Sequence, residues 1–501
     1  MDDSQNFFKT KNFIKSSNPS LNLISKYFNR FTNTLIDQSW TPLVLIAQTT
    51  IISLMQKITQ GKLRVLTQSG IYQFPAQKLS KSRVQDSDEL SAEIRVINNA
   101  FWVRMFLFSD LGFAEAYMVG DIQVDDLNSI FKLFIFNRSS LSELSMINSS
   151  LFSTLNLLMN SRFVNSISNS ISNISAHYDI SNEMFKAFLS QDMTYSCAYF
   201  TPKLGGPGGD LNQNLISLSN HQNLDPLELA QYEKLDLIIH KAKIRKNDRV
   251  LELGSGWGSF AIRAVQSTGC QVDTITLSVE QKALAQKRIQ ELGLQDSIRV
   301  HLLDYRNLPT KFEGAFDRVV SIEMIEAVGL EFLENYFSIV NKCLNSKSGI
   351  GVFQVITIPE ARFERYIKQV DFIRKWIFPG GILPTVTYMV DSIAKGSKNQ
   401  LTIESIENIG THYARTLREW QKRFESNFDS IIAPSLSQQY PEVKQNPQQI
   451  ETFRRKWVYY FSYCSTGFEC RVLGDHIFTI TREGNLFYHY KVIQSTYDGP
   501  Q

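Results

Sequence analysis

Two glutamates, Glu323 and Glu326, stand three residues apart at the end of an apolar run, in the stretch FDRVVSIEMIEAVG at 316–329. The run has the character of a buried strand, so both side chains are expected where that strand ends and a loop begins. Carboxylates are rarely buried unless they are paired or used in chemistry. The pattern predicts an active carboxylate here, and it leaves open which of the two acts and on what.

A glycine-rich turn lies upstream, in the stretch VLELGSGWG at 250–258. A strand runs into Gly254, Gly256 and Gly258, with Ser255 between the first two, and a helix follows. Glycine lets the backbone turn tightly and approach a ligand closely, and the first turn of the helix offers free N–H groups. By itself this pattern serves either a dinucleotide or a nucleoside.

Three features favour the nucleoside S-adenosylmethionine (SAM). Glu252 precedes the first glycine by two residues, where its carboxylate can hold the amine of the methionine part. The third glycine of the dinucleotide fingerprint is missing, because Phe260 and Ala261 occupy that neighbourhood. A later strand ends in HLLDYRNL, which puts Asp304, followed by Tyr305, at a second strand end, where the acid can bond the adenine amine.

The second strand of this unit departs from the general SAM-binding pattern. Such a strand should end in Asp or Glu, which holds the ribose hydroxyls. Here the stretch QVDTITLSVEQ ends in Thr276, Leu277 and Ser278, with Gln281 one turn later. We therefore expect hydroxyl and amide groups to replace the acid.

These motifs are set in an alternation of strands and helices that begins near residue 177, which implies a parallel, doubly wound sheet. The predicted fold class is α/β: a Rossmann-like class I SAM-dependent methyltransferase domain with a smaller N-terminal α+β domain and a helical connector. A chain of 501 residues is expected to hold two or three domains. The predicted divisions are an N-terminal segment at 1–55 with an apolar helix, the small domain at 56–137, the connector at 138–176 and the methyltransferase domain at 177–501.

The N-terminal part predicts contact with lipid. The apolar window PLVLIAQTTIISLM at 42–55 falls short of the roughly 20 residues needed to cross a bilayer. A basic stretch follows, with no acid between Gln38 and Gln85; it contains Lys57, Lys62, Arg64, Lys78, Lys81 and Arg83. An apolar helix followed by a basic stretch suits an anionic membrane surface, and a core helix followed by a solvated hairpin is the alternative.

The sequence also predicts the secondary structure of further segments. The stretches at 61–74 and 92–108 alternate like strands, and 110–121 is typical of a short helix that ends near Gly120. The glycine-rich insert at 205–223 is predicted as a flexible surface loop.

The composition narrows the class of protein. A net charge of +3 is too near balance to argue for a nucleic-acid partner. The five cysteines are scattered and odd in number, which fits a reduced compartment, and the histidines form no metal-ligand pattern. The first residues lack the features of a secretory signal. The sequence therefore predicts a cytoplasmic protein that attaches peripherally to a membrane and uses no metal.

Taken together, the motifs resemble those of the cyclopropane-fatty-acyl-phospholipid synthases, SAM-dependent enzymes that modify double bonds in lipid acyl chains. The likeness covers about 177–493 and, more weakly, 60–137, and it is nearest to eukaryotic, plant-type members. It is carried by HYDISNEMF, MTYSCAYF, VLELGSGWGSFAI, ITLSVEQ, LDYRNL, EMIEAVG, DFIRKWIFPGGILP, HYARTLREWQKRF and YYFSYCSTGFECRVLGDHIFTITREGN. The resemblance implies cyclopropane formation on the unsaturated acyl chains of membrane phospholipids, with an N-terminal domain that engages lipid and helps to form a homodimer.

The resemblance also implies how the proton is removed. In this family the base is thought to be a bound bicarbonate ion rather than a side chain. Cys197 matches a residue at the bicarbonate pocket, and Glu326 matches the acid that accepts a hydrogen bond from its hydroxyl. Tyr413 matches a donor to the anion, and Ile356 offers its backbone. On this basis Glu326 is the predicted working carboxylate, and Glu323, one turn away on the same helical face, is expected to orient the loop or touch the cofactor.

Other matches are less direct. Gln354 and Ala327 stand where many bacterial members have histidine, and glutamine can donate a hydrogen bond to bicarbonate but cannot carry a proton. Cys464 matches a cysteine once suspected of a nucleophilic role, although alkene methylation needs no covalent enzyme intermediate. Tyr195 and Ser196 match positions that face the SAM carboxylate.

Two alternatives stay open at this stage. A C-methyltransferase that gives a methyl-branched fatty acid or sphingolipid would share the cofactor and pocket motifs. A catalytically inactive lipid-binding protein on the same fold would keep the acyl channel, which is expected to be lined by the loop with Trp376, Phe378, Pro379 and Pro384.

Overall fold

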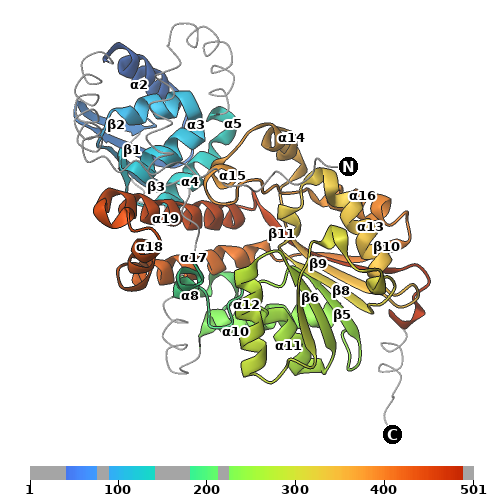
Figure 1. The fold of residues 1–501 in the computed structure, drawn as a ribbon. Coiled ribbons are helices and arrows are strands. Elements are labelled where there is room, and N and C mark those ends of the chain that lie inside the picture. The colour runs from blue at the N-terminus through green and yellow to red at the C-terminus, as the bar shows by residue number, and fades with distance from the viewer. Residues whose placement is uncertain (1–40, 76–89, 142–180, 213–224, 489–501) are drawn as a thin grey trace, which may run out of the picture.

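The computed structural model describes residues 41–75, 90–141, 181–212 and 225–488 (Figure 1). The predictions for the first 40 residues, for the connector from 142 onward and for the start of HYDISNEMF lie outside the described residues.

A seven-stranded sheet forms the centre of the larger domain, with the strand order β10-β11-β9-β8-β5-β6-β7. Strands β5 to β9 pair in parallel, whereas β11 runs antiparallel to β9 and β10. The order reverses beside β5, and ligands of such sheets bind at the carboxyl ends of the strands next to that point. The predicted α/β fold is confirmed. The strands are β5 (Arg249–Leu253), β6 (Gln271–Thr276), β7 (Ile298–Leu302), β8 (Arg318–Ile322), β9 (Ile350–Thr357), β10 (Leu401–Asn408) and β11 (Gly474–Arg482).

Helices alternate with these strands along the chain, and two long ones, α17 and α19, pack against each other. Helix α19 also contacts the small domain, so the pair lies between the two domains (Figure 1). The helices of this part are α8 (Asn182–Phe188), α10 (Pro226–Lys241), α11 (Ser259–Thr268), α12 (Val279–Glu291), α13 (Leu333–Cys343), α14 (Glu360–Lys368), α15 (Phe372–Trp376), α16 (Val386–Gly396), α17 (Gly410–Ser426), α18 (Ala433–Gln439) and α19 (Pro447–Glu469).

The small domain is a four-stranded sheet in the order β2-β1-β3-β4 with helices packed on it. Its strands are β1 (Lys62–Thr67), β2 (Gly70–Phe74), β3 (Ser91–Val96) and β4 (Ile122–Val124), and its helices are α2 (Thr41–Met55), α3 (Ala100–Val119), α4 (Leu127–Phe136) and α5 (Arg138–Leu141). Helix α2 packs on α3 through buried residues such as Ile51. The apolar helix therefore belongs to this domain rather than to a separate segment.

The strand predicted at 92–108 is wrong in its second half. Strand β3 ends at Val96, and the apolar residues from 100 onward form the long helix α3, which bends at Ser109. This helix is buried on most sides, so it lacks the polar face that would mark it as a helix in the sequence. It even buries Arg104, whose guanidinium pairs with Asp121 at 2.8 Å.

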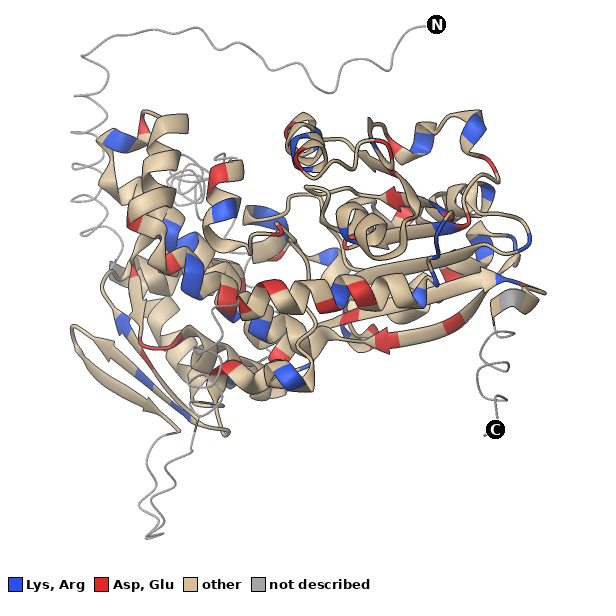
Figure 2. Ribbon diagram, turned by 90° about the horizontal axis from the view of Figure 1, so that it is seen from below, with Lys and Arg blue, Asp and Glu red and all other residues tan. Residues whose placement is uncertain are grey.

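The insert at 205–223 is more ordered at its start than predicted. Residues Gly206–Leu211 form a 3-10 turn, and the Asp210 carboxylate receives two hydrogen bonds from Arg418 of α17. Residues 213–224 lie outside the described residues. Figure 2 shows acidic and basic positions interspersed along the described elements, as the near-balanced net charge implies.

Candidate active site

The glycine turn follows β5, at the point where the strand order reverses. Gly254 and Gly256 have φ angles of 97° and 47°, in the left-handed region that glycine tolerates best. A Cβ at Gly256 would meet nothing within 4 Å, whereas one at Gly254 would come within 3.0 Å of the Met324 side chain. Open space therefore borders the turn at Gly256, and Gly258 begins α11 with the buried Ser255 behind it.

The carboxyl group of Glu252, just before this turn, offers a hydrogen-bond acceptor that no described residue uses. Its side chain is only 3% exposed, and its Oε2 has no hydrogen-bond partner among the described residues. Burial raises the pKa of this carboxyl to about 8. An unpartnered buried carboxylate oxygen is costly without a counterpart, and the ammonium group of SAM would be such a counterpart. The residues at the end of β5 thus fit the methionine part of SAM.

The end of β6 carries the hydroxyl and amide groups that were expected to replace an acid. The Thr276 hydroxyl donates to Gln281 Oε1 at 2.8 Å, and the Ser278 hydroxyl caps α12 by accepting the Gln281 N–H at 3.1 Å. The Leu277 side chain is 72% exposed. Thr276 and Gln281 hold each other in place, so the amide of Gln281 is oriented at this strand end.

Asp304 and Tyr305 follow β7 as predicted, but the acid is already engaged. The Asp304 carboxylate accepts hydrogen bonds from the Arg306 guanidinium, the shortest at 2.5 Å, and this partner lowers its pKa. Tyr305 packs edge-on against Tyr336 at 5.2 Å between ring centroids. The carboxylate that was predicted to bond the adenine amine therefore shares its oxygens with Arg306.

Tyr195 and Ser196 lie in the segment between α8 and α10 and point to different neighbours. The Tyr195 hydroxyl lies 3.1 Å from the Tyr460 hydroxyl. The buried Ser196 hydroxyl oxygen accepts a hydrogen bond from Lys234 Nζ at 2.6 Å. Lys234 was missed in the sequence, and it is fully buried on α10. The sequence did contain a sign of this burial, because Lys234 lies three residues after Gln231 and seven after Leu227, on the apolar face of that helix.

Glu323 directly follows β8, and its carboxylate accepts hydrogen bonds from three donors. Its Oε1 accepts the backbone N–H of Cys197 at 2.7 Å and the side-chain Nε2 of Gln354 at 2.8 Å. Its Oε2 accepts the hydroxyl of Tyr413 at 2.6 Å. The φ angle of Glu323 is 48°, so it does not share a helical face with Glu326. The expected helical relation is wrong because the strand ends in a left-handed residue before the chain turns.

Glu326 lies one short turn later, in the 3-10 helix Ile325–Ala327, and has a single partner. Its Oε1 accepts the backbone N–H of Ile356 at 2.6 Å, and its Oε2 is buried with no partner among the described residues. Burial, and then the charge of Glu323, raise its pKa to about 8. A second acid that the sequence did not single out, Asp475, is buried at the start of β11 and accepts Gln354 Nε2 at 2.8 Å.

Burial disfavours the thiolate form of the two predicted cysteines, Cys197 and Cys464. Cys197 is fully buried, and its Sγ lies 3.3 Å from the carbonyl oxygen of Ala198. Burial raises the pKa of both the Cys197 and the Cys464 thiol well above the ordinary value. Thiolates, not thiols, are the nucleophiles of cysteine chemistry, so neither residue is prepared for covalent catalysis.

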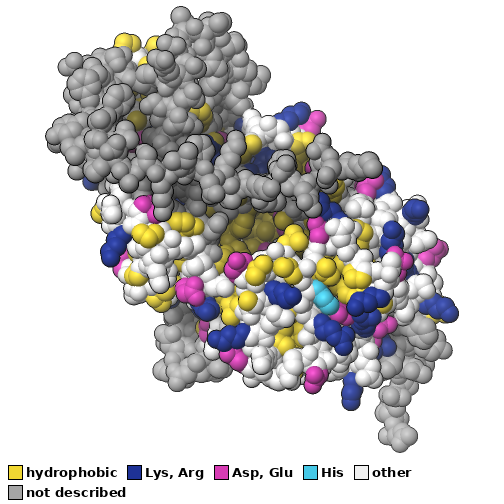
Figure 3. Space-filling model, viewed as in Figure 1, with side chains coloured by type: hydrophobic (Ala, Val, Ile, Leu, Met, Phe, Trp, Pro, Cys, Tyr) yellow, Lys and Arg dark blue, Asp and Glu magenta, His cyan; other side chains and the backbone are white. Residues whose placement is uncertain are grey.

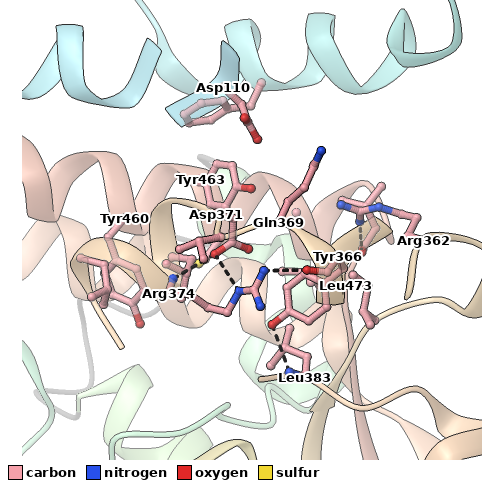
Figure 4. Close-up of a pocket in the computed structure, with 18 of the residues that line it drawn as sticks. Asp110, Arg362, Tyr366, Gln369, Asp371, Arg374, Leu383, Tyr460, Tyr463 and Leu473 are labelled. Atoms are coloured by element: carbon pink, nitrogen blue, oxygen red, sulfur yellow. Dashed lines mark hydrogen bonds and ion pairs between the residues drawn. The ribbon is translucent and has the colours of Figure 1, made fainter. Parts of the chain in front are cut away.

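A large cavity of about 1110 Å³ opens beside these carboxylates. Glu323, Glu326, Tyr195 and Tyr413 line its inner end, together with Cys464. Its walls run outward between α14, α15 and α19 into the small domain, where α2, α3, α4 and α5 contribute residues. In Figure 4 Asp110 of α3 faces Asp371, Arg374 and Tyr366 across this space. Of the predicted channel loop, Phe378 and Pro379 line the cavity, whereas Trp376 and Pro384 are not among the lining residues.

The contacts do not fit the bicarbonate ion implied by the resemblance. The backbone N–H of Cys197, the Tyr413 hydroxyl and the Gln354 amide all donate to Glu323. The backbone N–H of Ile356 donates to Glu326. The Tyr413 hydroxyl, the Gln354 amide and the Ile356 backbone N–H, which the resemblance assigns to the bicarbonate pocket, are thus each taken by a carboxylate of the chain itself.

The raised pKa of Glu326 predicts a pH-dependent stability. The ordinary value is 4.5, so the stability contributed by the neutral folded form is complete below that pH and is lost as the pH rises through about 8. A Glu326→Gln variant stays neutral and still accepts the Ile356 N–H. Between about pH 5 and pH 9, its unfolding free energy should gain on that of the wild type by on the order of 1 to 4 kcal/mol, measured by urea unfolding.

The matched control is Glu364→Gln. Glu364 is 90% exposed on α14, and its replacement should leave the pH profile parallel to that of the wild type. A Glu326→Gln profile that also runs parallel to the wild type would contradict the raised pKa.

Comparisons with known proteins identify relatives of this chain. A family model described as mycolic acid cyclopropane synthetase matches residues 165–475. The tuberculostearic acid methyltransferase of Mycobacterium tuberculosis is 34% identical over 312 residues, which cover 62% of this chain and 65% of that protein. The cyclopropane-fatty-acyl-phospholipid synthase of Escherichia coli is 30% identical over 402 residues, which cover 80% of this chain and 90% of that protein.

Among solved structures, a coclaurine N-methyltransferase bound to N-methylheliamine and SAH has a TM-score of 0.50 at 17% identity, covering 74% of this chain and 98% of its own. This likeness concerns the fold alone. The match of the family model to more than half of the chain, and the relative in Escherichia coli, confirm the predicted resemblance. The chain therefore belongs to the mycolic acid cyclopropane synthetase family and is a SAM-dependent methyltransferase related to the cyclopropane-fatty-acyl-phospholipid synthases.

Proposed function

We propose that the protein transfers the methyl group of SAM to a double bond in an acyl chain of a membrane phospholipid and closes a cyclopropane ring there. The observation that carries the proposal is the cavity. Its volume of about 1110 Å³ slightly exceeds the roughly 300–1,000 Å³ typical of ligand pockets. Apolar residues of both domains line it, among them Ile51, Phe134 and Ile373. A long acyl chain matches such a space.

The inner end of the cavity suits a reaction that passes through a positive charge on the substrate. SAM supplies a methyl group with a good leaving group. The aromatic rings of Tyr195, Phe378 and Tyr460 line the same region and contact one another at 6.0 to 6.3 Å between centroids, with Phe378 in the middle. Aromatic faces stabilise cations, and apolar walls exclude the water that would capture one.

Three arginines near the other end of the cavity favour a phosphate-bearing substrate. Arg138, Arg362 and Arg365 line the cavity, and none of them forms an ion pair with a carboxylate in the described part of the chain. Burial, and then the charges of Arg138 and Arg365, lower the pKa of the Arg362 guanidinium. Asp110 and Asp371 line the same cavity and offset part of this positive charge, and a lipid phosphate would neutralise more of it.

The small domain is proposed to rest on the membrane surface. Leu45 and Ile46 of α2 are 62% and 53% exposed, which leaves apolar side chains for the lipid interface. No helix in the described residues is long and apolar enough to cross a bilayer. Part of the basic stretch serves the fold instead, since Arg64 pairs with Glu93 at 3.1 Å, and Lys78, Lys81 and Arg83 lie outside the described residues. We propose that this attachment is from the cytoplasmic side and without insertion.

The proposal predicts a defined product. The full chain, incubated with SAM and vesicles of a mono-unsaturated phospholipid, should convert the acyl chain to its cyclopropane derivative, identified by chromatography and mass spectrometry after release. Micelles of the free fatty acid should react more slowly, because they lack the phosphate that the three arginines would hold. Equal rates on both substrates would remove the head group from the proposal, and the absence of any lipid product would remove the function.

A methyl-branched product is the second candidate. Two relatives are named for fatty acid methyl transfer, the tuberculostearic acid methyltransferase and a probable fatty acid methyltransferase of Pseudomonas putida, the latter 34% identical over 265 residues. The same incubation separates the two outcomes, because a branched or methylene product differs from a cyclopropane in chromatographic retention and in fragmentation.

A further inference from the structure

Three hydrogen-bond donors surround the carboxylate of Glu323 and form a slot that fits a planar oxyanion. Its three donors come from three distant parts of the chain: the segment after α8, strand β9 and helix α17. A carboxylate can accept about four hydrogen bonds. Oε1 accepts two and Oε2 accepts one, so one lone pair remains on Oε2. Glu323 lines the cavity, so a substrate bound there can approach this carboxylate.

The backbone at Glu323 is strained to place this side chain. A φ of 48° is in the left-handed region, which costs a residue with a side chain on the order of 1 kcal/mol or more. The backbone N–H of Glu323 is fixed there by the carbonyl oxygen of Gln354 at 2.8 Å. Glycine would adopt this conformation freely, so the side chain is kept despite its cost.

We propose that Glu323 is the general base of the reaction and replaces a bound bicarbonate ion, so that the enzyme works without bicarbonate. The inference rests on the proposed function. It is based on the contacts of Glu323, whose carboxylate is already held by Cys197, Tyr413 and Gln354. These are the residues that the resemblance assigns to a bicarbonate pocket.

The step balances without a further reagent. Methyl transfer to the alkene leaves a cation on the acyl chain that bears the new methyl group. Glu323 Oε2 accepts a proton from that methyl group, and the electron pair of the broken C–H bond forms the third C–C bond of the ring. Glu323 becomes a neutral carboxylic acid and later loses the proton to solvent. If ring closure does not occur, loss of a proton still requires the same base.

The neighbouring acids are less suited to this role. Asp475 is fully buried and is not among the residues that line the cavity. Glu326 lines the cavity, but among the described residues the Ile356 N–H is the only donor from another part of the chain that holds it. A base that must meet one C–H bond needs a fixed position, and three donors fix Glu323 where one fixes Glu326.

The side chain of Gln354 suits a site that contains the carboxylate of Glu323. Its Nε2 donates to Glu323 Oε1 and to Asp475 Oδ2, both at 2.8 Å, so the two hydrogens of one amide hold two carboxylates. A neutral imidazole has only one N–H donor. The glutamine that departs from the bacterial pattern therefore fits a site that contains Glu323.

The test compares two variants with the wild type in CO2-free buffer under argon and with added bicarbonate. Wild-type product formation should be the same in both. Glu323→Gln keeps the shape but loses the base, so its rate should fall about 100-fold or more, with no recovery. Glu323→Gly empties the slot and relieves the positive φ, so its rate should fall similarly and recover in part with tens of millimolar bicarbonate or formate.

A second readout needs no turnover. Bicarbonate should raise the thermal unfolding temperature of Glu323→Gly but not of the wild type, where the slot is filled. Glu331→Gln, an exposed acid in the turn Leu330–Phe332, is the matched control and should behave as the wild type in both assays.

The outcomes separate the two proposals. A wild-type rate that falls when bicarbonate is removed, or a Glu323→Gln variant as fast as the wild type, would overturn the base assignment. If the wild type forms no product on any lipid, the proposed function has failed. In that case a bicarbonate effect confined to Glu323→Gly supports the replacement of the ion, and equal stabilisation of wild type and variant overturns it.

Discussion

Replacing Glu252 with glutamine is expected to weaken SAM binding about 100-fold and to slow methyl transfer at low SAM by the same factor. Glu252 is buried beneath the glycine turn with one unpartnered oxygen. The variant would present an amide to the ammonium group of SAM and lose a hydrogen bond between two charges. The binding constant is measured by calorimetry with SAM or S-adenosylhomocysteine, and the rate by product formation across SAM concentrations.

A proton balance distinguishes this role from a purely structural one. In the absence of SAM, burial raises the pKa of Glu252 to about 8, so near pH 7 the group is mostly neutral. A bound ammonium would lower that pKa, and binding should release a proton, which appears as a dependence of the binding enthalpy on the buffer. The release should vanish in Glu252→Gln and persist in the control Glu233→Gln, an exposed acid on α10. Unchanged SAM affinity in Glu252→Gln would refute the assignment.

Replacing Ala327 with tryptophan is expected to reduce transfer to a long acyl chain about 100-fold or more while leaving SAM affinity unchanged. Ala327 lines the cavity directly after Glu326. An indole there would fill the space that the reacting part of the acyl chain is proposed to occupy, and a misplacement of about 1 Å already costs about 100-fold in rate. Product formation and SAM binding are measured on the same preparation.

The control for this variant places the same ring on the surface. Gln438 is exposed at the end of α18, and Gln438→Trp should keep the wild-type rate. Full activity in Ala327→Trp would show that the acyl chain does not pass this point. A loss of both SAM binding and thermal stability would instead indicate that the indole disturbs β8 and the turn after it.

The alternation of strands and helices, and the glycine turn after β5, could be predicted from the sequence because both depend on neighbouring residues. Period and turn chemistry are local properties, and they correctly placed the parallel strands and Glu252. The helix α3 could not be predicted in this way. Its start looks like a strand because a helix buried on most sides has no polar face to reveal its period.

The spacing of Glu323 and Glu326 was also a local signal, but it misled. A separation of three residues indicates that two side chains share one helical face. The backbone at Glu323 is left-handed instead, so the two side chains bind different partners. Lys234 and Asp475 were overlooked for a related reason. The place of Lys234 on the apolar face of its helix indicates that it is buried, but nothing in the neighbours of either residue shows that the two charged side chains lie beside the same site.

The sequence by itself determined that the chain forms a SAM-binding α/β domain and that a carboxylate follows the strand β8. The tertiary structure alone decided which carboxylate is held and by what. Cys197, Gln354 and Tyr413 lie 126, 31 and 90 residues from Glu323 along the chain, yet each donates to the same carboxylate. A hydrogen bond depends on distance and direction in space, so a donor set assembled from three elements has no signature in the spacing of the residues that compose it.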